Sequence, residues 1–118
     1  MTSRRPMGAL EEHVMAYLWA IGAPASPGEV HQAVAPELAY TTLTTVLTRL
    51  ADKGRVDRSR NGRSFVYSPV RTEAEHRADA MTTSLSSAAD RAAVLSTFVD
   101  SLNPKDLAKL RELVGEDD

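Results

Sequence analysis

The segment from Ala39 to Gly54 constrains the fold of this chain more than any other part of the sequence. Leucine and valine recur in it at i, i+3, i+4 and i+7, which predicts an amphipathic helix with one apolar face. Most of the opposite face is threonine, a poor helix former because its branched side chain loses rotamer freedom in a helix. The apolar positions are Leu43, Val46, Leu47 and Leu50, and the threonines are Thr41, Thr42, Thr44, Thr45 and Thr48.

Two interpretations of the threonine face are open at this point. Short side chains with a hydroxyl and a methyl group suit a helix in the major groove of DNA. There hydroxyls can bond base edges or phosphates, and methyls can touch thymine. Alternatively, the face packs on another helix or is solvated. Because the helix alone does not decide between the two, its neighbours in the sequence must.

Two further helical patterns precede this segment. An amphipathic helix is predicted over residues 7–21, with Gly22 at its end. Ser26-Pro27-Gly28-Glu29 is a capping box with proline at the first helical position, and it predicts a second helix that Pro36 ends. Since only a short connection follows, the second helix and the threonine helix form a helix-turn-helix.

After Gly54 the period of the sequence changes from 3.6 to 2. Asn61-Gly62 separates two alternating segments and is a strong signal for a two-residue hairpin turn. The pairs expected across this turn are Arg60 with Arg63, Arg58 with Phe65, and Val56 with Tyr67. Like charges opposite each other at the tip indicate an anionic partner such as DNA phosphate. Three helices and a basic hairpin predict a winged helix, with Phe65 and Tyr67 in its core.

Residues 72–118 return to a helical period and have the pattern of an association region. Their apolar residues alternate at spacings of four and three, as in the seam of a coiled coil, although Ser86 and Asp90 can divide this segment into two helices. Asn103-Pro104 is a further helix start. A narrow seam outside a domain with its own core is more typical of a homodimer interface than of a monomer's interior. The expected interface residues are Met81, Leu85, Ala88, Ala92, Leu95, Phe98, Val99, Leu102, Leu107 and Leu110.

The fold predicted from these patterns is mainly α with a small β-hairpin. Residues 1–71 form a winged helix-turn-helix domain that binds DNA, and residues 72–118 form a helical dimerisation region. Charge supports this division, because the net charge of −2 combines a net +3 over residues 1–71 with a net −5 over the rest. Residues 49–71 alone carry seven basic and two acidic groups. A basic patch on an acidic protein is typical of a nucleic-acid-binding domain joined to an association region.

Several classes of protein are excluded by what the sequence lacks. No apolar run approaches 18 residues, and a signal peptide is absent, so we expect a cytoplasmic protein without a membrane span. Zero cysteines exclude disulfides and cysteine metal sites. His13, His31 and His76 lie on different helices without partners at ligand spacing, and Glu11-Glu12 are interpreted as acids at a helix start. No metal, no cofactor and no enzymatic activity are expected.

Three motifs resemble the penicillinase-repressor family (BlaI/MecI/CopY). They are Leu10-Glu-x-x-Val-Met15-x-x-Leu-Trp19, the whole of residues 39–54, and Gly62-Arg-Ser-Phe-x-Tyr67. The resemblance is specific over residues 10–69 and loose over 72–115. It implies a dimeric winged-helix repressor that occupies a palindromic operator in double-stranded DNA, with the C-terminal helices interlocked in the dimer.

The resemblance also bears on how repression ends. The copper-responsive branch carries a C-terminal cysteine site, which this chain lacks. Antibiotic-responsive members are cleaved in the dimerisation region at an Asn-Phe bond. The similar position here is Thr97-Phe98, with Thr97 where asparagine would stand. A sensor protease that acts near Phe98 is therefore one partner that the resemblance implies.

Each predicted DNA contact has an expected role. On the threonine helix, Thr41, Thr42, Thr45 and Arg49 contact bases and phosphates, and Tyr40 touches the DNA backbone; on the hairpin, Arg60 and Arg63 bind phosphate or the minor groove. A rival interpretation is a winged helix that binds another protein, which would need neither the basic excess nor the exposed threonines. A ligand-sensing pocket at the dimer interface is a third, but few of the six aromatic residues lie in the C-terminal region.

Overall fold

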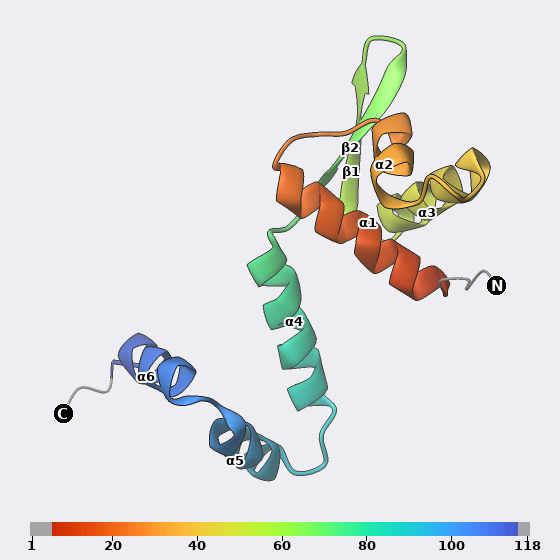
Figure 1. Ribbon diagram of the computed structural model, residues 1–118. Helices are drawn as coiled ribbons and strands as arrows, with labels where there is room; N and C mark the ends of the chain where they lie inside the picture. Colours follow the sequence, from red (N-terminus) through yellow and green to blue (C-terminus); the bar gives the residue numbers. More distant parts are fainter. Residues whose placement is uncertain (1–5, 116–118) are drawn as a thin grey trace. The chain divides into compact units, whose positions relative to one another are not determined.

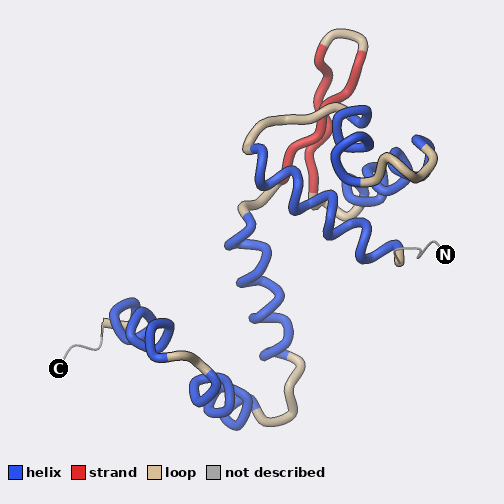
Figure 2. Tube along the Cα trace, viewed as in Figure 1, coloured by secondary structure: helices blue, strands red, loops and turns tan. Residues whose placement is uncertain are grey.

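The computed structural model describes residues 6–115, which form six helices and one hairpin (Figures 1 and 2). The chain divides into two compact units between His76 and Arg77, so that α4 begins in the first unit and continues into the second. The elements are α1 (Met7–Ile21), α2 (Pro27–Val34), α3 (Tyr40–Asp52), β1 (Val56–Asn61), β2 (Ser64–Pro69), α4 (Glu73–Ser86), α5 (Arg91–Ser101) and α6 (Pro104–Leu113). The predicted fold class, mainly α with a winged helix-turn-helix first, is confirmed.

The core of the first unit lies between α1, α2, α3 and the base of the hairpin, all of which contact one another. The apolar face of α3 is fully buried there, as the sequence predicts. Burying a leucine or valine contributes about 1.5–3 kcal/mol. Such a core therefore fixes the opposite face of α3 outward. The largest fully buried side chains are Met15, Leu18, Leu43, Leu47, Leu50, Val14, Val30 and Val46.

Local sequence signals determine where α1 ends and where α2 begins, the two helices that pack against α3. Gly22 ends α1 with a left-handed φ of 63°, and the Ser26–Glu29 capping box starts α2 with both of its hydrogen bonds formed. In the turn between α2 and α3, Nε2 of His31 donates to the carbonyl of Leu38 at 2.7 Å. The His31 ring also meets Tyr40 edge-on, with centroids 5.7 Å apart. His31 therefore stabilises the turn that orients α3.

The hairpin has a different register from the predicted one. Arg60 pairs with Phe65 instead of Arg63, and the other pairs include Arg58 with Tyr67 and Val56 with Pro69. Asn61 pairs with Ser64, so the two-residue turn is Gly62-Arg63, and of the residues from Asn61 to Ser64 only Gly62 has a positive φ, of 70°. A type I′ turn at Asn61-Gly62 would require positive φ at both residues, whereas a type II′ turn needs it only at its first central residue. The predicted Arg60–Arg63 pair is therefore wrong.

The base of the hairpin is fixed to the helices by a short third pairing. Ala25, in the connection between α1 and α2, exchanges two backbone hydrogen bonds with Tyr67, of 3.0 and 2.8 Å. Tyr67 is buried, as predicted. Phe65 is 39% exposed, so its predicted place in the core is wrong. The reason is that the part of the hairpin between Tyr67 and the turn projects past the helices as a free two-stranded ribbon (Figure 1).

An ion pair between a buried carboxylate and a half-exposed lysine joins α1 to the end of α3. The carboxylate of Glu11 is almost completely buried and accepts two hydrogen bonds from Nζ of Lys53, at 2.9 and 3.1 Å. Glu12 accepts a bond of 3.0 Å from Arg55. The interpretation of these two glutamates as acids at a helix start is therefore wrong, since α1 begins four residues before Glu11. The ion pairs fix the C-terminal end of α3 on α1.

Replacing Lys53 with Met should destabilise the first unit. The substitution leaves the buried Glu11 carboxylate without its cation, which we expect to lower the free energy of unfolding by about 1–2 kcal/mol. The loss is smaller than for a fully buried pair because the Lys53 side chain is 55% exposed. Urea unfolding at fixed protein concentration measures it. The double variant Glu11→Leu/Lys53→Met is the control and should recover part of the loss; a Lys53→Met variant as stable as the parent would contradict the role of the pair.

The second unit has no core of its own among the residues that the structure describes. None of the residues of α4, α5 or α6 is buried. Asp90 and Asn103 cap α5 and α6 through their side chains, as predicted. The helical pattern is broken between Ser86 and Arg91, so the predicted seam does not run along one helix and Ala88 lies in the connection.

Candidate nucleic-acid interface

The predicted contact residues on α3 lie together on its outer face. Thr41, Thr45 and Arg49 follow one another at intervals of four residues, so they form one strip along the helix, and all three are exposed. Thr42 is half-buried beside this strip. Tyr40, at the start of the helix, is 49% exposed and contacts His31. The structure thus brings the five predicted residues of α3 to one surface.

Several threonine hydroxyls on α3 bond to the helix itself. Oγ1 of Thr44 and Oγ1 of Thr45 both donate to the carbonyl of Thr41, at 3.0 and 2.9 Å. Oγ1 of Thr48 donates to the carbonyl of Thr44 at 2.9 Å. Such back-bonding satisfies the hydroxyl hydrogen without an external partner, although it does not raise the low helix propensity of threonine. The sequence pattern did not reveal it.

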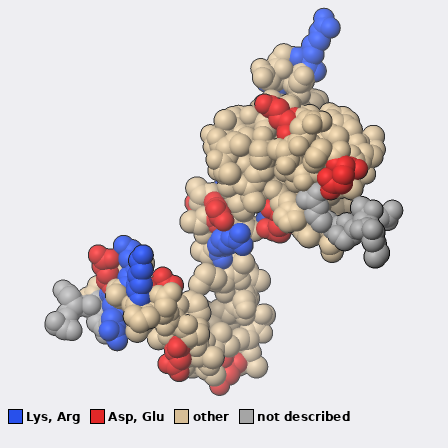
Figure 3. Space-filling view, in the orientation of Figure 1, with Lys and Arg blue, Asp and Glu red and all other residues tan. Residues whose placement is uncertain are grey.

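The hairpin carries three arginines beyond the core. Gly62-Arg63 forms the turn at the tip, and the guanidinium carbons of Arg58 and Arg60 lie 4.5 and 5.3 Å from the centroid of the Phe65 ring. Stacking on an aromatic face stabilises a guanidinium and restricts where it points. Figure 3 shows Lys and Arg side chains extending from the tip of the hairpin. Arg58 belongs to this group, although the predicted contact set lacks it. It lies two residues before Arg60 on the same strand, and this spacing, which places both on one face, is the signal that could have identified it.

Not every basic residue of the segment 49–71 is available to a partner. Lys53 and Arg55 pair with Glu11 and Glu12 of α1 and therefore serve the fold. Arg49 and Arg63, in contrast, are exposed and pair with no acid among residues 6–115. The basic surface that these contacts leave to a partner is therefore narrower than the composition suggests, and the described residues that we assign to it are at the end of α3 and on the hairpin.

Four of the predicted dimer residues, on α4 and α5, line one apolar hollow. It has a volume of about 470 Å³ and is lined in part by Met81, Leu85, Leu95 and Phe98. Met81 is 56% exposed and Leu95 47% exposed, although both are large and apolar. The other predicted residues, Ala88, Ala92, Val99, Leu102, Leu107 and Leu110, lie outside the lining of this hollow.

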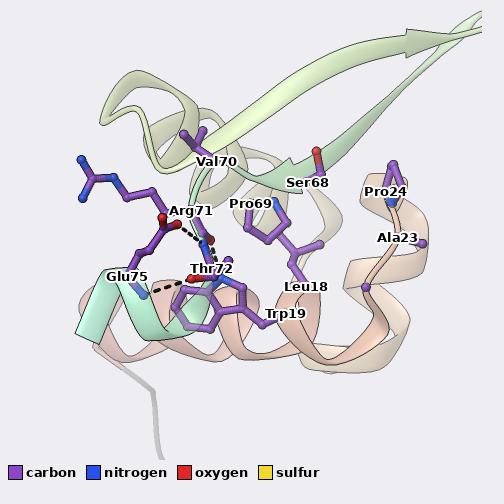
Figure 4. A pocket seen from close by; sticks show the side chains of 11 residues that line it. Leu18, Trp19, Ala23, Pro24, Ser68, Pro69, Val70, Arg71, Thr72 and Glu75 are labelled. Atoms are coloured by element: carbon purple, nitrogen blue, oxygen red, sulfur yellow. Dashed lines mark hydrogen bonds between the residues drawn. The ribbon is translucent and has the colours of Figure 1, made fainter. Parts of the chain in front are cut away.

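A second hollow, of about 460 Å³, lies beside Trp19 in the first unit (Figure 4). Several of the polar groups around it bond to one another. Nε1 of Trp19 donates to the carbonyl of Arg71 at 2.9 Å, and Thr72 and Glu75 form a capping box that starts α4. The hollow therefore marks where α4 joins the winged helix, and it offers little polar chemistry to a ligand.

The structure offers no site for a metal in the part of the chain that it describes. No three His, Asp or Glu side chains there are close enough to hold an ion. His76 accepts a hydrogen bond of 2.9 Å from Arg55, and its ring lies 5.3 Å from that of Trp19. Nor does any helix within residues 6–115 combine the length and apolarity needed to cross a membrane.

Helix-turn-helix geometry, an outward threonine face and a basic hairpin define a winged-helix protein of the nucleic-acid-binding type. The model of the penicillinase repressor family matches residues 7–116, and the chain belongs to that family. Its members are transcriptional regulators, not enzymes.

Two curated relatives and two solved structures are similar to this chain. The transcriptional regulators BlaI of Mycobacterium tuberculosis strains CDC 1551 / Oshkosh and H37Rv are each 37% identical over 115 residues, which cover 93% of this chain and 83% of each relative. MepR, a transcription regulator of the Staphylococcus aureus multidrug efflux pump MepA, is 16% identical, with 89% of this chain and 73% of that chain covered and a TM-score of 0.49. Lactococcus lactis ZitR is 13% identical, with 97% and 75% covered and a TM-score of 0.47.

Proposed function

We propose that this transcriptional regulator is a homodimeric repressor that binds a palindromic operator in double-stranded DNA. The observation that carries the proposal is the joint presentation of an outward threonine face on α3 and a basic hairpin by one rigid core. The second helix of a helix-turn-helix enters the major groove, and a wing reaches the adjacent backbone or minor groove. The protein would act in the cytoplasm.

The residues divide into two roles. Thr41, Thr42 and Thr45 face outward or sideways on the N-terminal half of α3, the part of a recognition helix that meets base edges. Arg49, Arg60 and Arg63 would supply positive charge for phosphates. We add Arg58 to this set because it lies with Arg60 on the hairpin. Tyr40 would touch the DNA backbone. The threonines would therefore specify the site, and the arginines would supply most of the affinity.

Dimerisation is supported by the second unit. Three helices without one buried residue, and with large apolar side chains exposed, cannot be stable as an isolated unit in water. A second copy is the partner that suits them, because an isologous two-fold pair is the commonest oligomer and matches a palindromic site. The interface would centre on Met81, Leu85, Leu95 and Phe98, with the rest of the predicted seam around it.

Selection from random duplexes tests the proposal without knowledge of the operator. Bound DNA recovered over several rounds should converge on a palindrome whose half-site centres are about one helical turn, roughly 34–36 Å, apart, or a multiple of it. The triple variant Thr41→Ala/Thr42→Ala/Thr45→Ala is the control and should bind DNA without converging on that sequence. A parent protein that recovers no common sequence would favour the rival protein-binding winged helix.

Release of the operator by a sensor protease near Phe98 stays a prediction. Thr97 and Phe98 lie in the middle of α5, and Oγ1 of Thr97 donates to the carbonyl of Ala93. Proteases cleave extended chain, so cleavage there requires local unfolding of α5. Mass spectrometry of the protein after induction would identify a cut after Thr97, and an intact chain in derepressed cells would contradict it.

A further inference from the structure

The hydroxyl groups of α3 limit what the middle of this helix can recognise. A threonine hydroxyl carries one hydrogen, and the hydroxyl of Thr45 donates it to the carbonyl of Thr41, 2.9 Å away. Thr48 does the same with the carbonyl of Thr44. Both side chains are nevertheless exposed. What they offer to a partner is therefore a methyl group and oxygen lone pairs, without a donor.

Base pairs differ in how they match such a surface. Guanine presents two acceptors in the major groove, N7 and O6, and both require a donor. An A·T pair also has acceptors, adenine N7 and thymine O4, but it adds the N6 amino donor of adenine and the thymine methyl group. The methyl group of Thr45 matches the thymine methyl group, and its free lone pair matches the N6 amino donor. A C·G pair offers an amino donor but no methyl group.

We propose that Thr45 recognises an A·T pair through the thymine 5-methyl group, and that guanine is disfavoured at the base it faces. The inference rests on the proposed function, in which α3 lies in the major groove. It is local, because Arg49 lies one turn further along and carries donors that suit guanine or phosphate. Thr45 is then a specificity-determining residue whose hydroxyl donates to the carbonyl of Thr41 and whose methyl group contacts the base.

Replacing thymine by deoxyuridine tests this directly, because deoxyuridine lacks only the 5-methyl group. In a duplex carrying the selected palindrome, each thymine is replaced in turn. One position in each half-site should be sensitive, with affinity about fourfold weaker for one half-site and about 15-fold weaker for both, as expected for the loss of one buried methyl group per half-site. Substitution at the remaining thymines should have little effect.

Two variants assign the effect to Thr45. Thr45→Ser keeps the hydroxyl but removes the methyl group, so the deoxyuridine duplex should bind it as well as the thymine duplex does. Thr45→Val keeps a methyl group and removes the hydroxyl, and it should still discriminate. This non-additivity is the signature of a direct contact. Thr48→Ser, on the same helix, is the matched control and should discriminate like the parent.

The outcomes separate this inference from the proposed function. Sequence-specific binding with no deoxyuridine effect at any thymine would overturn the inference and leave the repressor intact. A Thr45→Ser variant that still discriminates would overturn it as well, since another residue must then meet the methyl group. Absence of any sequence preference in the parent protein would contradict the proposed function and this inference together.

Discussion

Replacing Phe98 with Asp should weaken operator binding by roughly 10²- to 10⁴-fold while the winged helix stays folded. Phe98 lines the apolar hollow between α4 and α5, and a carboxylate there would be desolvated at the proposed two-fold interface. Two DNA-binding domains held together bind the second half-site at a high effective concentration. Separate chains lose that advantage without losing any DNA contact.

Sedimentation equilibrium and a binding titration on the same sample measure both parts of this result. Ser96→Asp is the matched control, because it adds the same charge to α5 outside the lining of the hollow and should leave dimerisation and binding unchanged. Circular dichroism and the protection of core amides in the first unit would verify folding. A Phe98→Asp protein that remains dimeric, or a monomer with parental affinity, would contradict the proposed interface.

The double variant Arg60→Ala/Arg63→Ala should lower the salt dependence of binding more than any change on α3. If each arginine neutralises one phosphate, the dimer loses four contacts and the slope of log K against log salt falls by about 3.6. Taking equal binding at 1 M salt, the affinity at 0.1 M falls by a factor on the order of 10³. The loss should be similar on selected and scrambled DNA, because phosphate contacts carry no sequence information.

Titrations at four or more salt concentrations give this slope. Lys105→Ala/Lys109→Ala removes two exposed positive charges from α6 and serves as the control for net charge. Its slope should be close to that of the parent. An unchanged slope in the Arg60→Ala/Arg63→Ala variant would remove the hairpin from the DNA contacts and would restrict the proposed interface to α3.

Elements with strong local signals could be predicted from the sequence. Gly22, the Ser26–Glu29 box, and the capping residues Asp90 and Asn103 define helix ends within a few residues of themselves, and the structure has all four in these roles. The apolar face of α3 was predicted for the same reason, since its period alone determines which side is buried.

The hairpin register could not be predicted with the same certainty. Asn61-Gly62 suits a type I′ turn and Gly62-Arg63 suits a type II′ turn, so the choice depends on the backbone angle of a single residue. A shift of two positions keeps Arg58, Arg60 and Phe65 on one face, so the basic hairpin survived the error. The predicted burial of Phe65 was wrong, because burial on the hairpin depends on how far the helices of the first unit extend along it.

Contacts between residues distant in the sequence were missed altogether. Glu11 and Lys53 are 42 positions apart, and nothing near either residue indicates that they form an ion pair. The basic count over residues 49–71 therefore overstated the charge available to DNA. The bonds of Thr45 and Thr48 to their own helix were also missed, because a hydroxyl can donate to the helix or to a partner and the sequence pattern is the same.

The most direct test of the central claim is equilibrium binding of the intact protein to the selected palindrome, with stoichiometry and salt dependence measured together. The account predicts two chains per duplex, a strong preference over a scrambled duplex, and a log–log salt slope of about −7 if Arg49, Arg58, Arg60 and Arg63 of both chains meet phosphates. Equal affinity for the two duplexes, or a slope near zero, would contradict it.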